Sequence, residues 1–169
     1  MKKRTSSKLG RGPGLAGLAV LSALSALGAA AASAAVVSAV VAADSELELL
    51  ERAEGGSYQR YSIWLGVVDG VAMLSADKDG EVTKVEVPLD EALALWRELL
   101  SEDVETLADA SPEQVVPDQS RFTLRFKVGD ARGGFTVYGV DSLMDGRYRQ
   151  VVRAILKLAD TQVRRARGR

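Results

Sequence analysis

An uncharged, strongly apolar segment near the start of the chain constrains its placement more than any other feature. No charged residue occurs between Arg11 and Asp44, and most residues in that interval are Ala, Leu, Val, Gly or Ser. A helix needs about 20 apolar residues to cross the hydrocarbon core of a bilayer. Five basic residues and no acidic residue precede the segment, an asymmetry that keeps an N-terminus in the cytoplasm. We therefore expect a basic cytoplasmic region at 1–11 and a membrane segment at 12–43, with the rest of the chain extracytoplasmic.

Two interpretations of this membrane segment stay open. A signal peptide has an apolar run of about 7–15 residues followed by a small-residue cleavage site. Residues 15–27 fit the run, and Ala-Ser-Ala at 32–34 or Val-Ala-Ala at 41–43 fits the site. Apolar character continues past Ala34, which favours a retained transmembrane anchor. The first interpretation predicts a secreted or periplasmic protein, and the second predicts a single-pass membrane protein with an extracytoplasmic C-terminal domain.

The composition of the chain excludes much of the usual chemistry of protein sites. The sequence has no Cys and no His, which excludes disulfides, thiolate or imidazole metal ligands, and catalytic triads that use either residue. Five of the 22 basic residues precede residue 12, so residues 44–169 carry 17 basic and 23 acidic side chains, a formal charge of −6. A nucleic-acid-binding domain is expected to be basic, so we expect no nucleic-acid partner. We recognise no cofactor-binding or catalytic motif, and we expect neither a cofactor nor an enzymatic activity.

The first part of the exported region predicts an antiparallel sheet. Residues 44–57 are acidic and end in Gly-Gly-Ser, so we expect a short helix or a juxtamembrane stalk there. Alternating apolar residues predict half-buried strands, and Asp-Gly pairs between them are typical of tight hairpin turns. The three strands predicted in this way lie at 58–68, 71–76 and 81–87.

Beyond Pro88 the apolar pattern changes to spacings of three and four residues, which indicates helices. We expect one helix over 89–100, a long connection over 101–116 with Pro112 and Pro117 against regular structure, and a last helix over 145–163. Between them we expect a hairpin of strands at 121–128 and 135–140, joined by a Gly-rich loop at 129–134. The resulting β-β-β-α-β-β-α order predicts an α+β domain at 58–163 with both helices on one face of an antiparallel sheet. A basic tail follows at 164–169. The aromatic residues expected in the core are Trp64, Trp96, Phe122, Phe126, Phe135 and Tyr148.

Residues 75–86 match part of the spacing of a calcium-binding loop. Asp77, Asp79 and Glu86 fall at ligand positions, and Gly80 falls at the turn position. Pro88 follows too soon for the helix that should leave such a loop. We therefore favour a solvated hairpin and keep Asp77, Asp79 and Glu86 as the only candidate metal ligands.

Two other sets of polar residues are candidate functional groups. Asp69, Asp77 and Asp79 lie on neighbouring turns, where carboxylates can act as acid and base, although hairpin turns themselves favour Asp. Arg121, Arg125 and Lys127 alternate with apolar residues along one predicted strand. They are candidates for binding a partner, and the alternative is that they simply point into solvent.

The element order gives one resemblance to a known family. The stretch Arg-Phe-Thr-Leu-Arg-Phe at 121–126, the hairpin that follows it and the closing amphipathic helix resemble small bacterial domains of the emfourin type, over roughly residues 58–160. That resemblance implies inhibition of a thermolysin-like metallopeptidase, and no inhibitory residue carries over.

Together, these features predict a membrane-tethered or exported, non-enzymatic binding module of the cell envelope. We expect its partner to be an envelope protein that contacts the sheet face or the connection at 105–120. The alternatives are an inhibitor of an extracytoplasmic peptidase and a carboxylate-based hydrolase.

Overall fold

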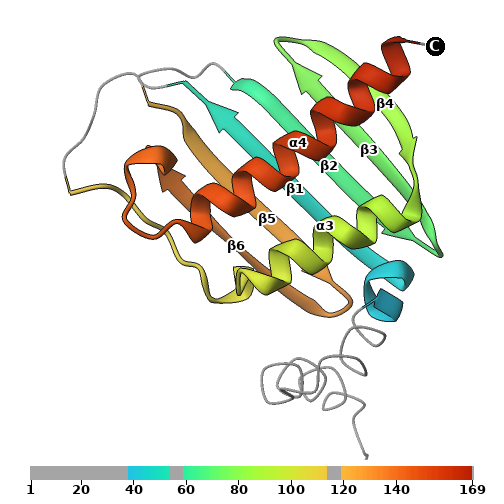
Figure 1. Cartoon of the computed structure of the whole chain (residues 1–169), viewed down its shortest axis with the longest axis horizontal. Coiled ribbons are helices and arrows are strands. Elements are labelled where there is room, and N and C mark those ends of the chain that lie inside the picture. Colours follow the sequence, from blue (N-terminus) through green and yellow to red (C-terminus); the bar gives the residue numbers. More distant parts are fainter. Residues whose placement is uncertain (1–37, 54–58, 114–118, 169) are drawn as a thin grey trace, which may run out of the picture.

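The computed structural model describes residues 38–53, 59–113 and 119–168. These residues form a six-stranded antiparallel sheet with two long helices across one of its faces (Figure 1). The strands are β1 (Asp44–Arg52), β2 (Gln59–Val68), β3 (Val71–Lys78), β4 (Glu81–Val87), β5 (Arg121–Val128) and β6 (Ala131–Tyr138), and the helices are α3 (Leu89–Ser101) and α4 (Arg147–Arg167). Two 3-10 helices, at Val104–Thr106 and Val140–Ser142, complete the regular elements. The spatial order of the strands is β4-β3-β2-β1-β5-β6, and the fold is of the predicted α+β class.

Strand β1 lies inside the sheet, and it corrects the prediction for the residues after the membrane segment. Residues 44–52 form neither a helix nor a stalk, because β1 pairs with β2 on one side and with β5 on the other. Leu47 and Leu49 face the helices and are buried, whereas Glu46 and Glu48 point to the opposite face. The predicted β-β-β-α-β-β-α order therefore lacked its first strand. The folded domain begins before residue 44 and not at residue 58.

The last residues of the predicted membrane segment also belong to the folded domain. Residues 38–43 are helical, and Val41 is fully buried in the core. The backbone N–H of Gly70 donates to the carbonyl of Ala42 at 2.8 Å, and that of Asp69 donates to the carbonyl of Ala43 at 3.1 Å. The rest of the predicted segment, residues 12–37, lies outside the described residues. No helix among the described residues combines the length and the apolar character that a membrane crossing requires.

The turns of the sheet have the geometry that their residues predict. Asp69 and Gly70 join β2 to β3 with φ angles of 49° and 79°. Asp79 and Gly80 join β3 to β4 with φ angles of 54° and 88°. Positive φ at both central residues defines the turn that matches the twist of a two-stranded hairpin. The prediction of a hairpin over residues 75–86 is therefore confirmed.

Both helices lie on the same face of the sheet and bury one apolar stripe each (Figure 1). Helix α4 continues to Arg167, so residues 164–167 are part of this helix and not a separate tail. Its last turns are held by two ion pairs, Arg165 Nη1 to Glu91 Oε1 at 2.6 Å and Arg167 Nη2 to Glu81 Oε1 at 2.7 Å. Of the predicted core aromatics, four are buried and Phe126 packs at the margin of the core. Trp64 is the exception, because it lies on the other face of the sheet.

The outer edge of β6 is covered by the long connection after α3. The N–H of Ala110 donates to the carbonyl of Thr136 at 3.0 Å, and the N–H of Tyr138 donates to the carbonyl of Ala110 at 3.1 Å. The N–H of Thr136 also donates to Asp109 Oδ1 at 2.6 Å. Unpaired strand edges invite pairing with other chains, so this part of the 105–120 connection protects the edge of the sheet.

Candidate functional site

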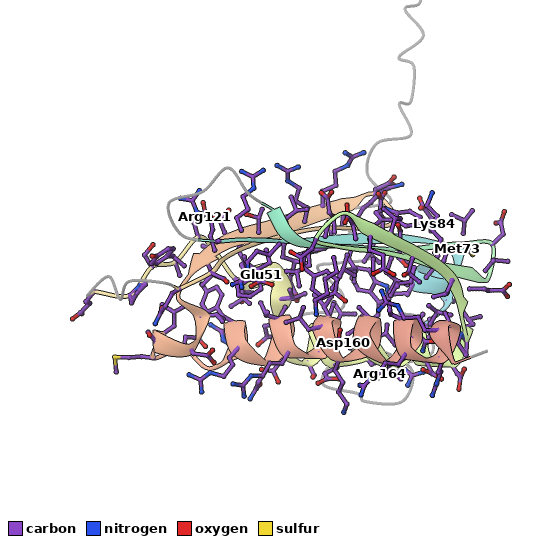
Figure 2. All side chains as sticks on the ribbon, turned by 90° about the horizontal axis from the view of Figure 1, so that it is seen from above. Glu51, Met73, Lys84, Arg121, Asp160 and Arg164 are labelled. Atoms are coloured by element: carbon purple, nitrogen blue, oxygen red, sulfur yellow. The ribbon has the colours of Figure 1, made fainter. Side chains whose placement is uncertain are left out.

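The face of the sheet opposite α3 and α4, here called the open face, has no helix packed across it among the described residues. Figure 2 views the domain edge-on, with Glu51 between the sheet and α4 and Arg121 projecting from the other side. The open face carries alternate residues of every strand, because successive side chains of a strand point to opposite faces. One face of an antiparallel sheet commonly remains solvated in this way. Side chains on this face are therefore in contact with solvent unless they pair with one another.

The basic side chains predicted on β5 lie on the open face, and β1 neutralises two of them. Lys127 Nζ lies 2.6 Å from Asp44 Oδ2, and Arg125 Nη1 lies 3.8 Å from Glu48 Oε2. Exposed ion pairs of this kind contribute only about 0.2–1 kcal/mol to stability. Their main effect is that the acidic side chains of β1 compensate the charge of the neighbouring basic side chains of β5 on the open face.

Arg121, the third predicted basic residue, belongs to a different group. The strand register places it directly opposite Arg52 of β1. Arg60, in the adjoining strand β2, is exposed at the same end of the sheet. We call these three residues the arginine cluster. Among the described residues, none of the three side chains has a carboxylate partner. Three guanidinium groups therefore lie at one end of the sheet, beside the β3–β4 turn, whose Asp79 N–H donates to the carbonyl of Arg60 at 3.2 Å.

The other end of the open face carries an exposed apolar patch, formed by Trp64, Val68, Val71 and Met73 of the β2–β3 hairpin. Their side chains are 36–59% exposed. The indole ring of Trp64 lies across Gly66, where a Cβ atom would clash with Trp64 Cη2. Its Nε1 donates to Glu46 Oε1 at 2.6 Å. The ring is thus held flat on the sheet and forms an ordered surface.

The candidate calcium ligands occupy separate parts of the β3–β4 hairpin. Asp77 Oδ1 accepts the N–H of Gly80 at 2.9 Å, which stabilises the turn. Asp79 is itself a turn residue, and Glu86 lies on β4 opposite Met73. In the described part of the chain, no three acidic side chains approach closely enough to hold a metal ion.

The three aspartates considered as an acid–base set are not neighbours. Asp69 lies in the turn before β3, whereas Asp77 and Asp79 lie at the end of that strand. Asp69 and Asp77 are eight steps apart along an extended strand, which separates them by about 27 Å. The prediction that the turns are adjacent is wrong, because a hairpin places successive turns at opposite ends of the sheet.

A second polar region lies between the sheet and the C-terminal half of α4. Tyr61 Oη donates to Asp160 Oδ1 at 3.2 Å. Burial and the neighbouring Asp160 carboxylate raise the pKa of Tyr61 to about 12. Lys78 Nζ lies 5.8 Å from the centre of the Tyr61 ring. The protonated hydroxyl group acts as a donor that joins α4 to the sheet, and the raised pKa extends this state to higher pH.

Comparison with known proteins adds no further assignment. No protein-family model matches the chain, and no curated protein matches it.

Proposed function

We propose that this chain is a non-enzymatic interaction module of the cell envelope, tethered to the membrane or exported, that binds an envelope protein through the open face. The arginine cluster is the observation that carries the proposal. A guanidinium group presents its donors in a planar fork that fits carboxylates in bidentate pairs. Three such groups on an uncovered face suit an acidic protein surface.

The charge distribution supports a specific contact and not a general attraction to anions. Residues 44–169 have a formal charge of −6, so the domain as a whole repels polyanions. The arginine cluster concentrates positive charge at one end of a face whose centre holds the acidic residues of β1. Complementary patterns of this kind increase association rates and suppress wrong partners.

Charge reversal on the two faces of the domain tests the proposal. The full chain carrying Arg52→Glu and Arg121→Glu should lose a partner that the wild-type chain captures from a detergent extract of the envelope. The matched control carries Arg97→Glu and Lys157→Glu, two exposed residues of α3 and α4. It changes the net charge equally and should keep the partner. Equal capture by both variants would refute binding through the open face.

The resemblance to emfourin-type domains suggests an extracytoplasmic metallopeptidase as one such partner. The 121–126 stretch that carries the resemblance forms most of β5, and Arg121 and Arg125 lie on the open face. A thermolysin-like enzyme incubated with the full chain provides the assay. Inhibition that is lost in the Arg52→Glu/Arg121→Glu variant supports this alternative, and unchanged activity at micromolar chain removes it.

The packing of Val41 bears on how the chain is held at the membrane. Cleavage after Ala43 would remove a fully buried core residue and the carbonyl groups that accept from Asp69 and Gly70. Cleavage after Ala34 would leave these contacts in place. We therefore propose two forms of the protein, a retained anchor or a domain released at residue 34.

A further inference from the structure

The apolar patch lies at the end of the sheet where the N-terminal segment enters the domain. Residues 38–43 run directly into β1, and the carbonyls of Ala42 and Ala43 accept from the turn between Val68 and Val71. These two valines are the most exposed members of the patch. The tip of the β2–β3 hairpin and the point of entry are therefore one continuous region.

The length of the uncharged segment leaves almost no linker between this region and a bilayer. The segment 12–43 ends with six helical residues, of which Val41 is buried in the core of the domain. The remaining 26 residues exceed the roughly 20 that a spanning helix requires by only a few. No charged or Gly-Ser-rich spacer separates them from β1. A domain tethered so closely holds this end of the sheet at the membrane interface.

We propose that the apolar patch rests in the interfacial layer of the bilayer that residues 12–37 enter, so that the arginine cluster faces away from the membrane. This inference rests on the membrane tether of the proposed function. Tryptophan favours the headgroup layer, where its apolar ring and its N–H group are both accommodated. Trp64 presents such a ring, with its N–H already bonded to Glu46. Nine residues of β1 place the arginine cluster about 27 Å from the patch end of the sheet.

The charges around the apolar patch indicate that burial of apolar surface, and not electrostatic attraction, holds the patch to the bilayer. Asp69 lies in the turn between the two valines, and Glu86 lies opposite Met73, with the exposed Lys84 two residues away on the same face of β4. These two carboxylates and one ammonium group leave a net negative charge, which gives anionic headgroups no attraction. The lipid surface that fits is therefore zwitterionic, and the contact should persist at high salt.

The two tryptophans of the chain supply the test. The full chain is reconstituted into phosphatidylcholine vesicles that contain lipid brominated near the headgroup. Trp64 should lose most of its emission, whereas Trp96, which is 1% exposed, should not. The Trp64→Phe chain isolates the Trp96 signal, so the difference between the two chains reports on Trp64.

A matched pair of valine variants identifies the patch as the cause. Val68→Asp should abolish the quenching of Trp64, and Val82→Asp should leave it unchanged. Val82 is equally exposed, at 55% against 59%, but belongs to the edge strand β4. Neither substitution removes a core side chain, so both variants should fold.

Resistance to alkaline carbonate extraction separates the possible failures. A chain that carbonate extracts from the vesicles overturns the retained tether on which the inference rests. A chain that stays in the vesicles but shows no quenching of Trp64 overturns the inference and leaves the tether intact. Equal quenching in the Val68→Asp and Val82→Asp chains also overturns it.

Discussion

Replacing Leu49 with Ala tests whether β1 is the central strand of the domain. Leu49 is 1% exposed and lies in register between Ile63 of β2 and Leu124 of β5. The change removes about three carbons, each worth about 0.8 kcal/mol of transfer free energy, and leaves a cavity under the helices. We expect a loss of about 3 kcal/mol in the free energy of unfolding, within the range of about 2–5 kcal/mol for buried Leu→Ala changes. A domain of ordinary stability, about 5–15 kcal/mol, would lose a large fraction of it.

The neighbouring residue provides the control for this experiment. Leu50 belongs to the same strand but lies half-buried on the open face, so Leu50→Ala should cost less than about 1 kcal/mol. Both variants are measured as full chains in a mild nonionic detergent, by urea unfolding followed through circular dichroism. The urea dependence should not change, because the folded and unfolded states expose the same backbone in both. Equal costs at the two positions, or no cost at Leu49, would refute a central β1 and favour a solvated stalk.

The N-terminus of the native protein should be Met1 or Ala35 and not Asp44, which intact mass measurement of membrane and soluble envelope fractions decides. The pKa of Tyr61 is raised from its ordinary 10.0 to about 12, so the stability that it contributes is complete below pH 10 and is lost as the pH rises toward about 12. Urea midpoints of the wild-type chain should therefore fall more steeply across this interval than those of Tyr61→Phe, and parallel curves would contradict the shift. Gly66→Ala should displace the indole ring of Trp64 and shift its emission to longer wavelength, whereas an unchanged spectrum would contradict the packing of the ring on the sheet.

The local signals of the sequence were sufficient for β2 to β5 and for both helices, whereas β6 begins at Ala131 and not at 135, because Gly133 and Gly134 pair within the strand and the turn is only Gly129-Asp130. Strict alternation of apolar residues marked the strands, and the Asp-Gly pairs marked the hairpin turns, where positive φ is required. The sequence analysis does not predict β1 as a strand, because its acidic residues are also typical of a solvated helix or stalk. Glu46 and Glu48 alternate with the buried Leu47 and Leu49, which is the pattern of a strand with one open face. In an antiparallel sheet a central strand can carry charge on its solvated side, and here basic residues of β5 oppose it.

The candidate site was predictable only in part, because it depends on strands that are distant in the sequence. Arg121 follows from the alternation of β5, but its position opposite Arg52 requires β1 to lie beside β5. Trp64 was assigned to the core from its aromatic character. The alternation of β2 places it on the face opposite Ile63 and Leu65, which are buried. The alternation of side chains along β2 therefore predicts the exposure of Trp64 better than its aromatic character does.

Photo-crosslinking in the native envelope tests most directly whether the open face binds a partner. A photoreactive residue replaces Thr123 on the open face of β5, and in a matched chain it replaces Lys157 on the exposed side of α4. We expect one defined crosslinked protein from position 123, its loss when Arg52→Glu and Arg121→Glu are added, and no defined product from position 157. A defined product from position 157 alone would contradict the account and place the binding surface on the helices.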